Sequence, residues 1–161
     1  MSVGVIHPTL WKSIVLGKLS SIEAYREALL TRQNRITWEA GDLFKKTQVS
    51  EKEIEVKLAK VTVGSLGLKG RATLKEIIPS AERLGLGLCP AEVDPGLRLA
   101  YENQPDGENL MIAMGALTGY DGMYFIFRVR KVDNVRWLGC DCAEYCTDWP
   151  PDQSFIFQLC E

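Results

Sequence analysis

Apolar residues recur at helical spacing through the first third of the chain. Residues 20–34 place apolar side chains three and four positions apart, and Ser20 with Glu23 forms a capping box at their start. Residues 8–18 repeat this spacing and end near a glycine, and residues 37–46 show it once more. The pattern therefore predicts two short helices packed as a hairpin, followed by a third helix.

The period then changes to that of a strand. Residues 51–64 alternate charged and apolar side chains, and a change of parity near Leu58 predicts a β-bulge. Residues 73–85 return to helical spacing and begin with a second capping box. Residues 90–103 fit either a helix opened by a proline or an alternating strand, and both interpretations stay open.

The last third of the chain predicts a β meander of four strands, at residues 109–117, 122–132, 134–140 and 154–160. A two-residue turn at Asp133 and Asn134 places Val129 opposite Leu138 on the face that we expect to form the core. The other face is expected to be exposed, and its candidate binding residues are Tyr124, Arg128, Arg130 and Trp137.

These elements predict an α+β fold in a single domain, residues 1–161. Residues 1–50 form a helical N-terminal segment, and residues 51–161 form an α+β core that ends in the meander. We expect about five mainly antiparallel strands, with helices covering one face of the sheet. The short N-terminal helices suit a monomer's core and a homodimer interface equally well.

Composition and charge limit the classes of function. With 46% hydrophobic and 25% charged residues in 161, the chain is typical of soluble globular proteins. A net charge of -2 makes nucleic acid an unexpected partner, because phosphate binding needs a basic excess. The N-terminus lacks a secretory signal pattern, and no apolar run approaches the roughly 20 residues that cross a bilayer. We therefore expect a cytoplasmic protein that does not bind membranes.

Three of the five cysteines lie close together, at Cys140, Cys142 and Cys146. A structural zinc site usually has four ligands in closely spaced pairs, so this spacing makes a zinc-stabilised domain an alternative that lacks a defined fourth ligand. Cys140 and Cys142 point the same way on the predicted strand, toward the core. We expect them to be buried packing residues, with no metal and no cofactor.

Five carboxylates gather around a proline-rich loop, and a pair of them could act as a general acid and base. They are Glu92, Asp94, Glu102, Asp106 and Glu108. A small enzyme using these groups is therefore an alternative function. Solvated loop charges are the commoner meaning of such a run, and we assign no catalytic residue.

Residues 82–117 contain the run L-C-P-A-E-V, then L-R-L and a Q-P turn. This stretch resembles small proteins of unassigned function from uncultured bacteria, and the resemblance extends roughly from Ile54 to the C-terminus. It implies a bacterial, cytoplasmic protein and identifies no site residues.

The function that we predict rests on the exposed meander face. An arginine beside an indole can stack on it for roughly 0.5 to 1 kcal/mol. We therefore predict a non-enzymatic binding or interaction protein whose partner is another protein or a small molecule. Tyr124, Arg128, Arg130 and Trp137 would make the contacts.

Overall fold

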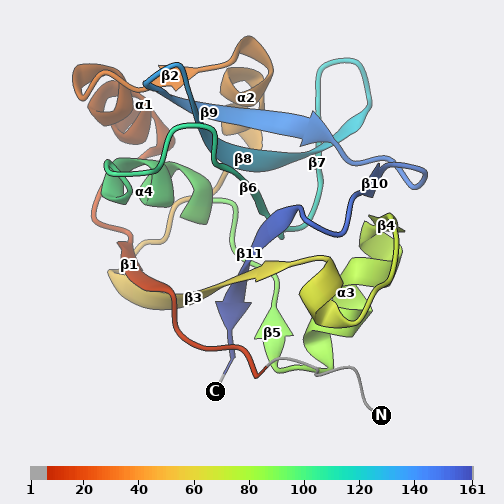
Figure 1. Cartoon of the computed structure of the whole chain (residues 1–161). Coiled ribbons are helices and arrows are strands. Elements are labelled where there is room, and N and C mark those ends of the chain that lie inside the picture. The colour runs from red at the N-terminus through yellow and green to blue at the C-terminus, as the bar shows by residue number, and fades with distance from the viewer. Residues whose placement is uncertain (1–6, 161) are drawn as a thin grey trace.

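The computed structural model describes residues 7–160 and is drawn in Figure 1. The helices in this range are α1 (Ile22–Thr31), α2 (Trp38–Leu43), α3 (Leu74–Glu82) and α4 (Val93–Ala100), with 3-10 turns η1 (Phe44–Lys46) and η2 (Gly64–Leu66). The strands are β1 (Lys12–Leu16), β2 (Arg35–Ile36), β3 (Ile54–Thr62), β4 (Ala72–Thr73), β5 (Leu86–Gly87), β6 (Asn109–Ile112), β7 (Leu117–Thr118), β8 (Tyr124–Val132), β9 (Val135–Cys142), β10 (Asp148–Trp149) and β11 (Ser154–Leu159).

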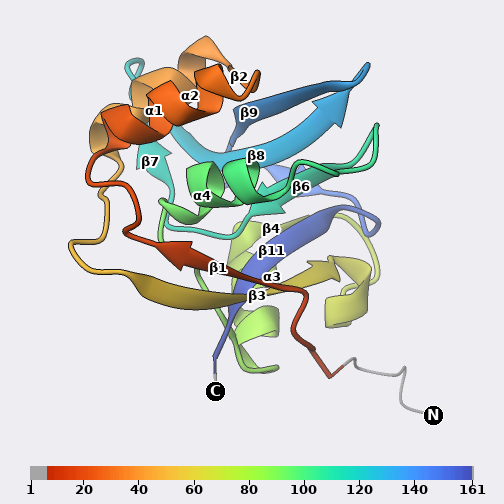
Figure 2. The same ribbon diagram turned by 90° about the vertical axis from the view of Figure 1, so that its left-hand side faces the viewer.

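The main sheet has nine strands, so the predicted five-stranded sheet is wrong. Its order is β1-β3-β11-β6-β8-β9-β2, with β5 added to β11 and β7 added to β8. Two pairs, β11–β6 and β2–β9, are parallel, and the other pairs are antiparallel. The sheet curls, so that α4 lies between β8–β9 and β1–β3 in Figure 2.

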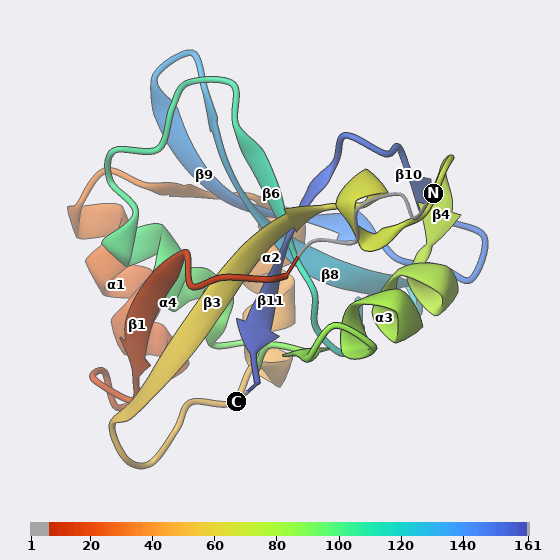
Figure 3. The same cartoon turned by 60° about the horizontal axis from the view of Figure 1, so that its bottom comes forward.

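The prediction that helices cover only one face of the sheet is also wrong. Helices α3 and α4 lie on opposite sides of β3 and β11 in Figure 3. Strand β3 explains why: Val56 and Leu58 are buried in its first half, and Ala59 and Val61 in its second. The pairing of β3 with β1 and with β11 has no interruption, so the bulge predicted near Leu58 is not present. The buried positions change from one face of β3 to the other because each face is covered in a different half of the strand.

The N-terminal segment is only partly helical. Residues 8–18, predicted as a helix, contain strand β1, which pairs with the first half of β3. Ile14 and Leu16 are buried while the residues between and before them are not, which is the burial pattern of a strand. Helix α1 is confirmed, but Ser21 and not Ser20 caps it by accepting from the Ala24 N–H.

The remaining helix predictions are confirmed. Helices α2 and α3 lie where predicted, and α3 has the capping box that Thr73 and Glu76 indicate. Within the ambiguous residues 90–103 the helix alternative holds for Val93–Ala100, which form α4, but the helix begins at Val93 and is not opened by Pro90. Pro95 lies in the first turn of α4, where the missing N–H of a proline costs the helix no hydrogen bond.

Hairpin β8–β9 is the best-predicted part of the fold. Asp133 and Asn134 have φ angles of 50° and 64°, as a type I′ turn requires, and Arg130 pairs with Trp137 as expected. The fourth strand of the predicted meander does not follow β9, however. Strand β11 lies between β3 and β6, so only β6, β8 and β9 form a meander.

One hydrophobic cluster includes residues from both the N-terminal segment and the rest of the chain. Leu29 of α1 and Phe44 of η1 are buried in it, and the Phe44 and Phe127 rings lie 6.0 Å apart. The described part of the N-terminal segment, residues 7–50, therefore contributes to the same core as the strands. Within the described range, no helix has both the length and the apolar character needed to cross a bilayer.

Candidate functional site

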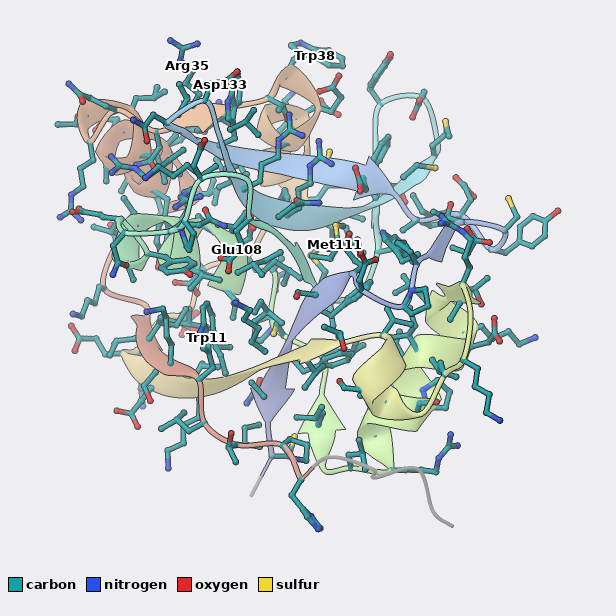
Figure 4. All side chains as sticks on the ribbon, in the orientation of Figure 1. Trp11, Arg35, Trp38, Glu108, Met111 and Asp133 are labelled. Carbon is teal, nitrogen blue, oxygen red and sulfur yellow. The ribbon has the colours of Figure 1, made fainter. Side chains whose placement is uncertain are left out.

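The site is the outer face of β2, β9 and β8, where we define Arg35, Arg128, Arg130 and Trp137 as the arginine–tryptophan face. Arg35 pairs with Trp137, and Trp137 pairs with Arg130, so these three side chains form one row across three strands. The Arg35 guanidinium carbon lies 5.7 Å from the centroid of the Trp137 ring. Figure 4 shows Arg35 at the periphery of the molecule.

In the next row of the face, Arg128 forms an ion pair and its side chain occupies the space beside Gly139. Arg128 Nη1 lies 2.8 Å from Asp141 Oδ1, and both side chains are largely but not fully buried. A Cβ on Gly139 would lie 3.4 Å from Arg128 Nε, so the glycine leaves room for Arg128 to cross β9. Arg128 Nε and Asn109 Oδ1 are both buried without a hydrogen-bond partner. The face thus has an unused donor and an unused acceptor on nearby strands.

Tyr124 is not brought together with the other three predicted residues. It lies six residues from Arg130 on β8, which corresponds to roughly 20 Å along an extended strand. Ile126, between Tyr124 and Arg128 on the same side of β8, is fully buried. Tyr124 is 48% exposed beside Glu144, whose carboxylate accepts from its N–H. It therefore belongs to a separate part of the surface.

Sequence reasoning missed Arg35. The residue lies in a two-residue strand between two helices, and only its parallel pairing with β9 places it beside Trp137. Asn109 was also missed, although its position opposite Arg130 follows once β6 is paired with β8. The alternation within β6 and β8 could have indicated Asn109, whereas no local pattern indicates Arg35.

A buried arginine contacts the same strands from the inside. Arg98 of α4 is fully buried, and its Nη1 donates to the carbonyl oxygens of Arg130 at 3.1 Å and Trp137 at 3.4 Å. The same nitrogen donates to Gln104 Oε1, and Nη2 donates to the Tyr101 carbonyl, both at 2.6 Å. Burial lowers the pKa of Arg98 to about 10, and Asp94 opposes this shift.

Gln104 extends this contact to the rest of the hairpin. Its Nε2 donates to the Val129 carbonyl at 3.2 Å and to the Glu108 carbonyl at the same distance. Glu108 in turn forms an ion pair with Lys60 of β3 at 2.7 Å. We call Arg98, Gln104 and Glu108 the inner polar network, and it fixes the backbone that carries Arg130 and Trp137.

The five candidate carboxylates do not gather. Glu102 and Asp106 are exposed as expected, but the expectation of solvated charges is wrong for Glu92 and Asp94, which are 1% and 0% exposed. Glu92 accepts hydrogen bonds from the Gly17 N–H, the Ser50 N–H and the Tyr25 hydroxyl. These bonds tie α4 to the loops on either side of α1 and α2.

Asp94 differs from Glu92 in having no hydrogen-bond partner for either carboxylate oxygen. Burial raises the pKa of Asp94 well above its ordinary value, and the positive charge of Arg98 acts in the opposite direction. Because this carboxyl group is fully enclosed, a substrate cannot reach it in this conformation. An acid–base pair accessible from a pocket is therefore not formed by these two residues.

Well-formed hollows lie beside helix α1. One of about 430 Å³ lies between β1, α1 and α4, and one of about 300 Å³ lies between α1 and α2 beside Trp38. None of the five carboxylates lines either hollow. The geometry therefore gives no support to the alternative of an enzyme that uses this loop.

The clustered cysteines lie at the end of β9. Cys140 pairs with Phe127 and packs against the core as predicted, and burial raises the pKa of its thiol to about 12. Cys142 pairs with Phe125 but is only partly buried and lies outside the hydrophobic cluster, so the prediction that it is a buried packing residue is wrong. Cys146 is exposed in the following loop. Among residues 7–160, no three histidine, cysteine or acidic side chains are grouped so that they could hold a metal ion.

Comparison with protein-family models, with curated protein sequences and with solved structures gives no match for this chain. The resemblance of residues 82–117 to small bacterial proteins therefore stays a prediction, as does the cytoplasmic location.

Proposed function

We propose that this chain is a non-enzymatic binding protein whose arginine–tryptophan face recognises an anionic segment of a partner protein. The observation that carries the proposal is the row Arg35–Trp137–Arg130, in which an arginine lies on the strand to each side of one tryptophan and the Arg35 guanidinium lies over its ring. Neither Arg35 nor Arg130 has an ion-pair partner among the described residues. A carboxylate can accept two parallel hydrogen bonds from a guanidinium group, which suits an acidic peptide.

The chemistry of the face favours a protein partner over nucleic acid. Single-stranded nucleic acid usually stacks successive bases on several aromatic rings. This face offers one indole, and Tyr124 lies too far along β8 to continue the row. The chain also carries a net charge of -2, so it lacks the basic excess that binding along a nucleic-acid backbone needs.

The inner polar network supports recognition by fixing the face before a partner arrives. Arg98 hydrogen-bonds the carbonyl oxygens of the two residues whose side chains point outward. A surface that is already ordered loses less conformational entropy on binding. Arg98 is in this account a positioning residue and does not contact the partner.

The test measures the affinity of a fluorescently labelled oligoglutamate peptide by anisotropy at low salt. We expect the double variant Arg35→Ala/Arg130→Ala to bind about tenfold more weakly than the unaltered chain, since each lost charge-assisted hydrogen bond weakens binding. The matched control Arg71→Ala/Arg83→Ala removes the same charge elsewhere and should change the affinity little. Equal losses in the two double variants, or tighter binding of an oligonucleotide than of the peptide, would contradict the proposal.

A further inference from the structure

The hollow between β1, α1 and α4 has the size and lining of a small-molecule site. Its volume of about 430 Å³ falls within the usual range for ligand pockets. Figure 2 looks onto this side of the molecule, where β1, α1 and α4 lie next to one another. The walls are mainly apolar, and include Ile14, Leu19 and Leu99.

Small side chains on the two helices leave this space open. Ala28 of α1 and Gly96 and Ala100 of α4 line the groove, where longer side chains would fill it. A Cβ on Gly96 would lie 3.4 Å from Ile14 Cδ1, so α4 approaches β1 closely at the bottom. Tyr25, also in the wall, is fixed by its hydroxyl bond to Glu92. The groove therefore has walls on three elements, β1, α1 and α4.

Two cations line the groove without partners. Lys18 and Arg32 are exposed, and neither side chain forms an ion pair or hydrogen bond with another described residue. Arg136 Nη2 binds the Arg32 carbonyl and adds positive charge nearby. Glu55 is the one acidic residue in the lining. An apolar hollow with an excess of positive charge favours a ligand with an apolar body and an anionic end.

Lys18 and Arg32 lie before and after α1, about 15 Å apart along the helix axis, so one carboxylate meets only one of them. We propose that this groove binds an amphipathic monocarboxylate, with its hydrocarbon chain against Ile14, Leu19 and Leu99 and its carboxylate at Arg32, where Arg136 adds positive charge. This site is separate from the arginine–tryptophan face, because no residue of that face lines the groove. Ligand binding here therefore stands or falls independently of the proposed recognition of acidic segments.

The test uses decanoate below its micelle concentration, with isothermal titration calorimetry for affinity and methyl NMR for location. We expect saturable binding that shifts the methyl signals of Ile14, Leu19 and Leu99. Decyltrimethylammonium has a similar chain and the opposite charge, and should bind at least about tenfold more weakly. Acetate, which lacks the chain, should not bind measurably.

Two sets of variants locate the determinants. Arg32→Gln should weaken decanoate binding about tenfold, since a charge-assisted contact is lost. The control Lys75→Gln removes the same charge from a residue outside the groove and should leave the affinity unchanged. Ala28→Leu, which fills the hollow from a helix that tolerates leucine, should abolish binding while circular dichroism stays unchanged. Absence of decanoate binding, equal binding of the cationic analogue, or full affinity in Ala28→Leu would overturn the proposal.

Discussion

At the C-terminal end of α4, buried Arg98 donates hydrogen bonds to four acceptors, whereas one turn earlier Asp94 is equally buried and has no hydrogen-bond partner. Glu92, at the start of the same helix, accepts three hydrogen bonds. Burial alone is costly for all three charged groups. The difference shows that partners decide whether a buried charge orders the surrounding chain or destabilises it.

Arg98 and Asp94 also differ in how they act on the neighbouring strands β8 and β9. Arg98 fixes the backbone of Arg130 and Trp137 and so prepares the outer face for binding. Asp94 fixes nothing by hydrogen bonding, and its charge acts mainly on the pKa values of Arg98 and Cys140. Removing the charge should therefore have opposite effects on stability at Arg98 and at Asp94.

The largest effect is expected for Arg98→Leu. This change leaves the Gln104 Oε1 atom and the carbonyls of Tyr101, Arg130 and Trp137 without their buried donor. The free energy of unfolding should fall by about 3 to 5 kcal/mol. Urea denaturation measures it, with Arg83→Leu at the exposed end of α3 as the control. A loss below about 1 kcal/mol would mean that Arg98 does not hold the hairpin.

Glu92→Gln should have the next largest effect. The amide nitrogen of the introduced glutamine cannot accept a hydrogen bond. Either the Gly17 N–H and the Tyr25 hydroxyl, which share one oxygen of Glu92, or the Ser50 N–H would therefore lose its acceptor. We expect a loss of about 1 to 3 kcal/mol in the free energy of unfolding. Thermal and urea unfolding measure this loss. A variant as stable as the unaltered chain would show that these bonds are not formed in solution.

Arg130→Ala/Trp137→Ala should cost less stability, about 1 kcal/mol, because both side chains are only half-buried on the outer face. The same double variant should lose binding to oligoglutamate. Circular dichroism and urea denaturation report the fold, and anisotropy reports the binding. A chain that no longer folds would show that this face is part of the core, and the binding proposal would fail with it.

Asp94→Asn should have an effect that starts near zero in acid and grows with pH. Burial raises the pKa of Asp94 in the folded chain, so the folded state binds a proton more tightly than the unfolded state, whose value is near 3.8. Stability from this group is therefore present below pH 3.8 and is lost as pH rises toward the folded pKa. Asparagine cannot ionise, so the variant should gain stability relative to the unaltered chain across that range. Urea midpoints that remain parallel from acid to neutral pH would contradict this.

The outer face could be predicted because its information is local. Alternation along 122–132 and 134–140 and a turn with two positive φ angles fix the register of β8 and β9. That register places Arg130 beside Trp137 and Cys140 toward the core, both as predicted. Periodicity is enough to predict this register because the paired residues of one hairpin are close in sequence.

Non-local pairing explains what could not be predicted. In residues 8–18 the positions of Leu10, Trp11, Ile14 and Val15 also suit a helix, and only pairing with β3 makes a strand. Strand β11 enters beside β6 from a distant part of the sequence, which no local pattern records. The burial of Glu92 and Asp94 follows from the packing of α4 inside the curled sheet, and charged residues next to prolines otherwise favour a solvated loop.

The most direct test follows the four tryptophan indole N–H signals by NMR during titration with oligoglutamate. The Trp137→Phe variant assigns the Trp137 signal. If the arginine–tryptophan face is the binding surface, the Trp137 signal should shift and saturate while those of Trp11 and Trp149 stay in place, and Arg35→Ala/Arg130→Ala should remove the shift. A Trp137 signal that does not respond, or that responds equally in that double variant, would contradict the account.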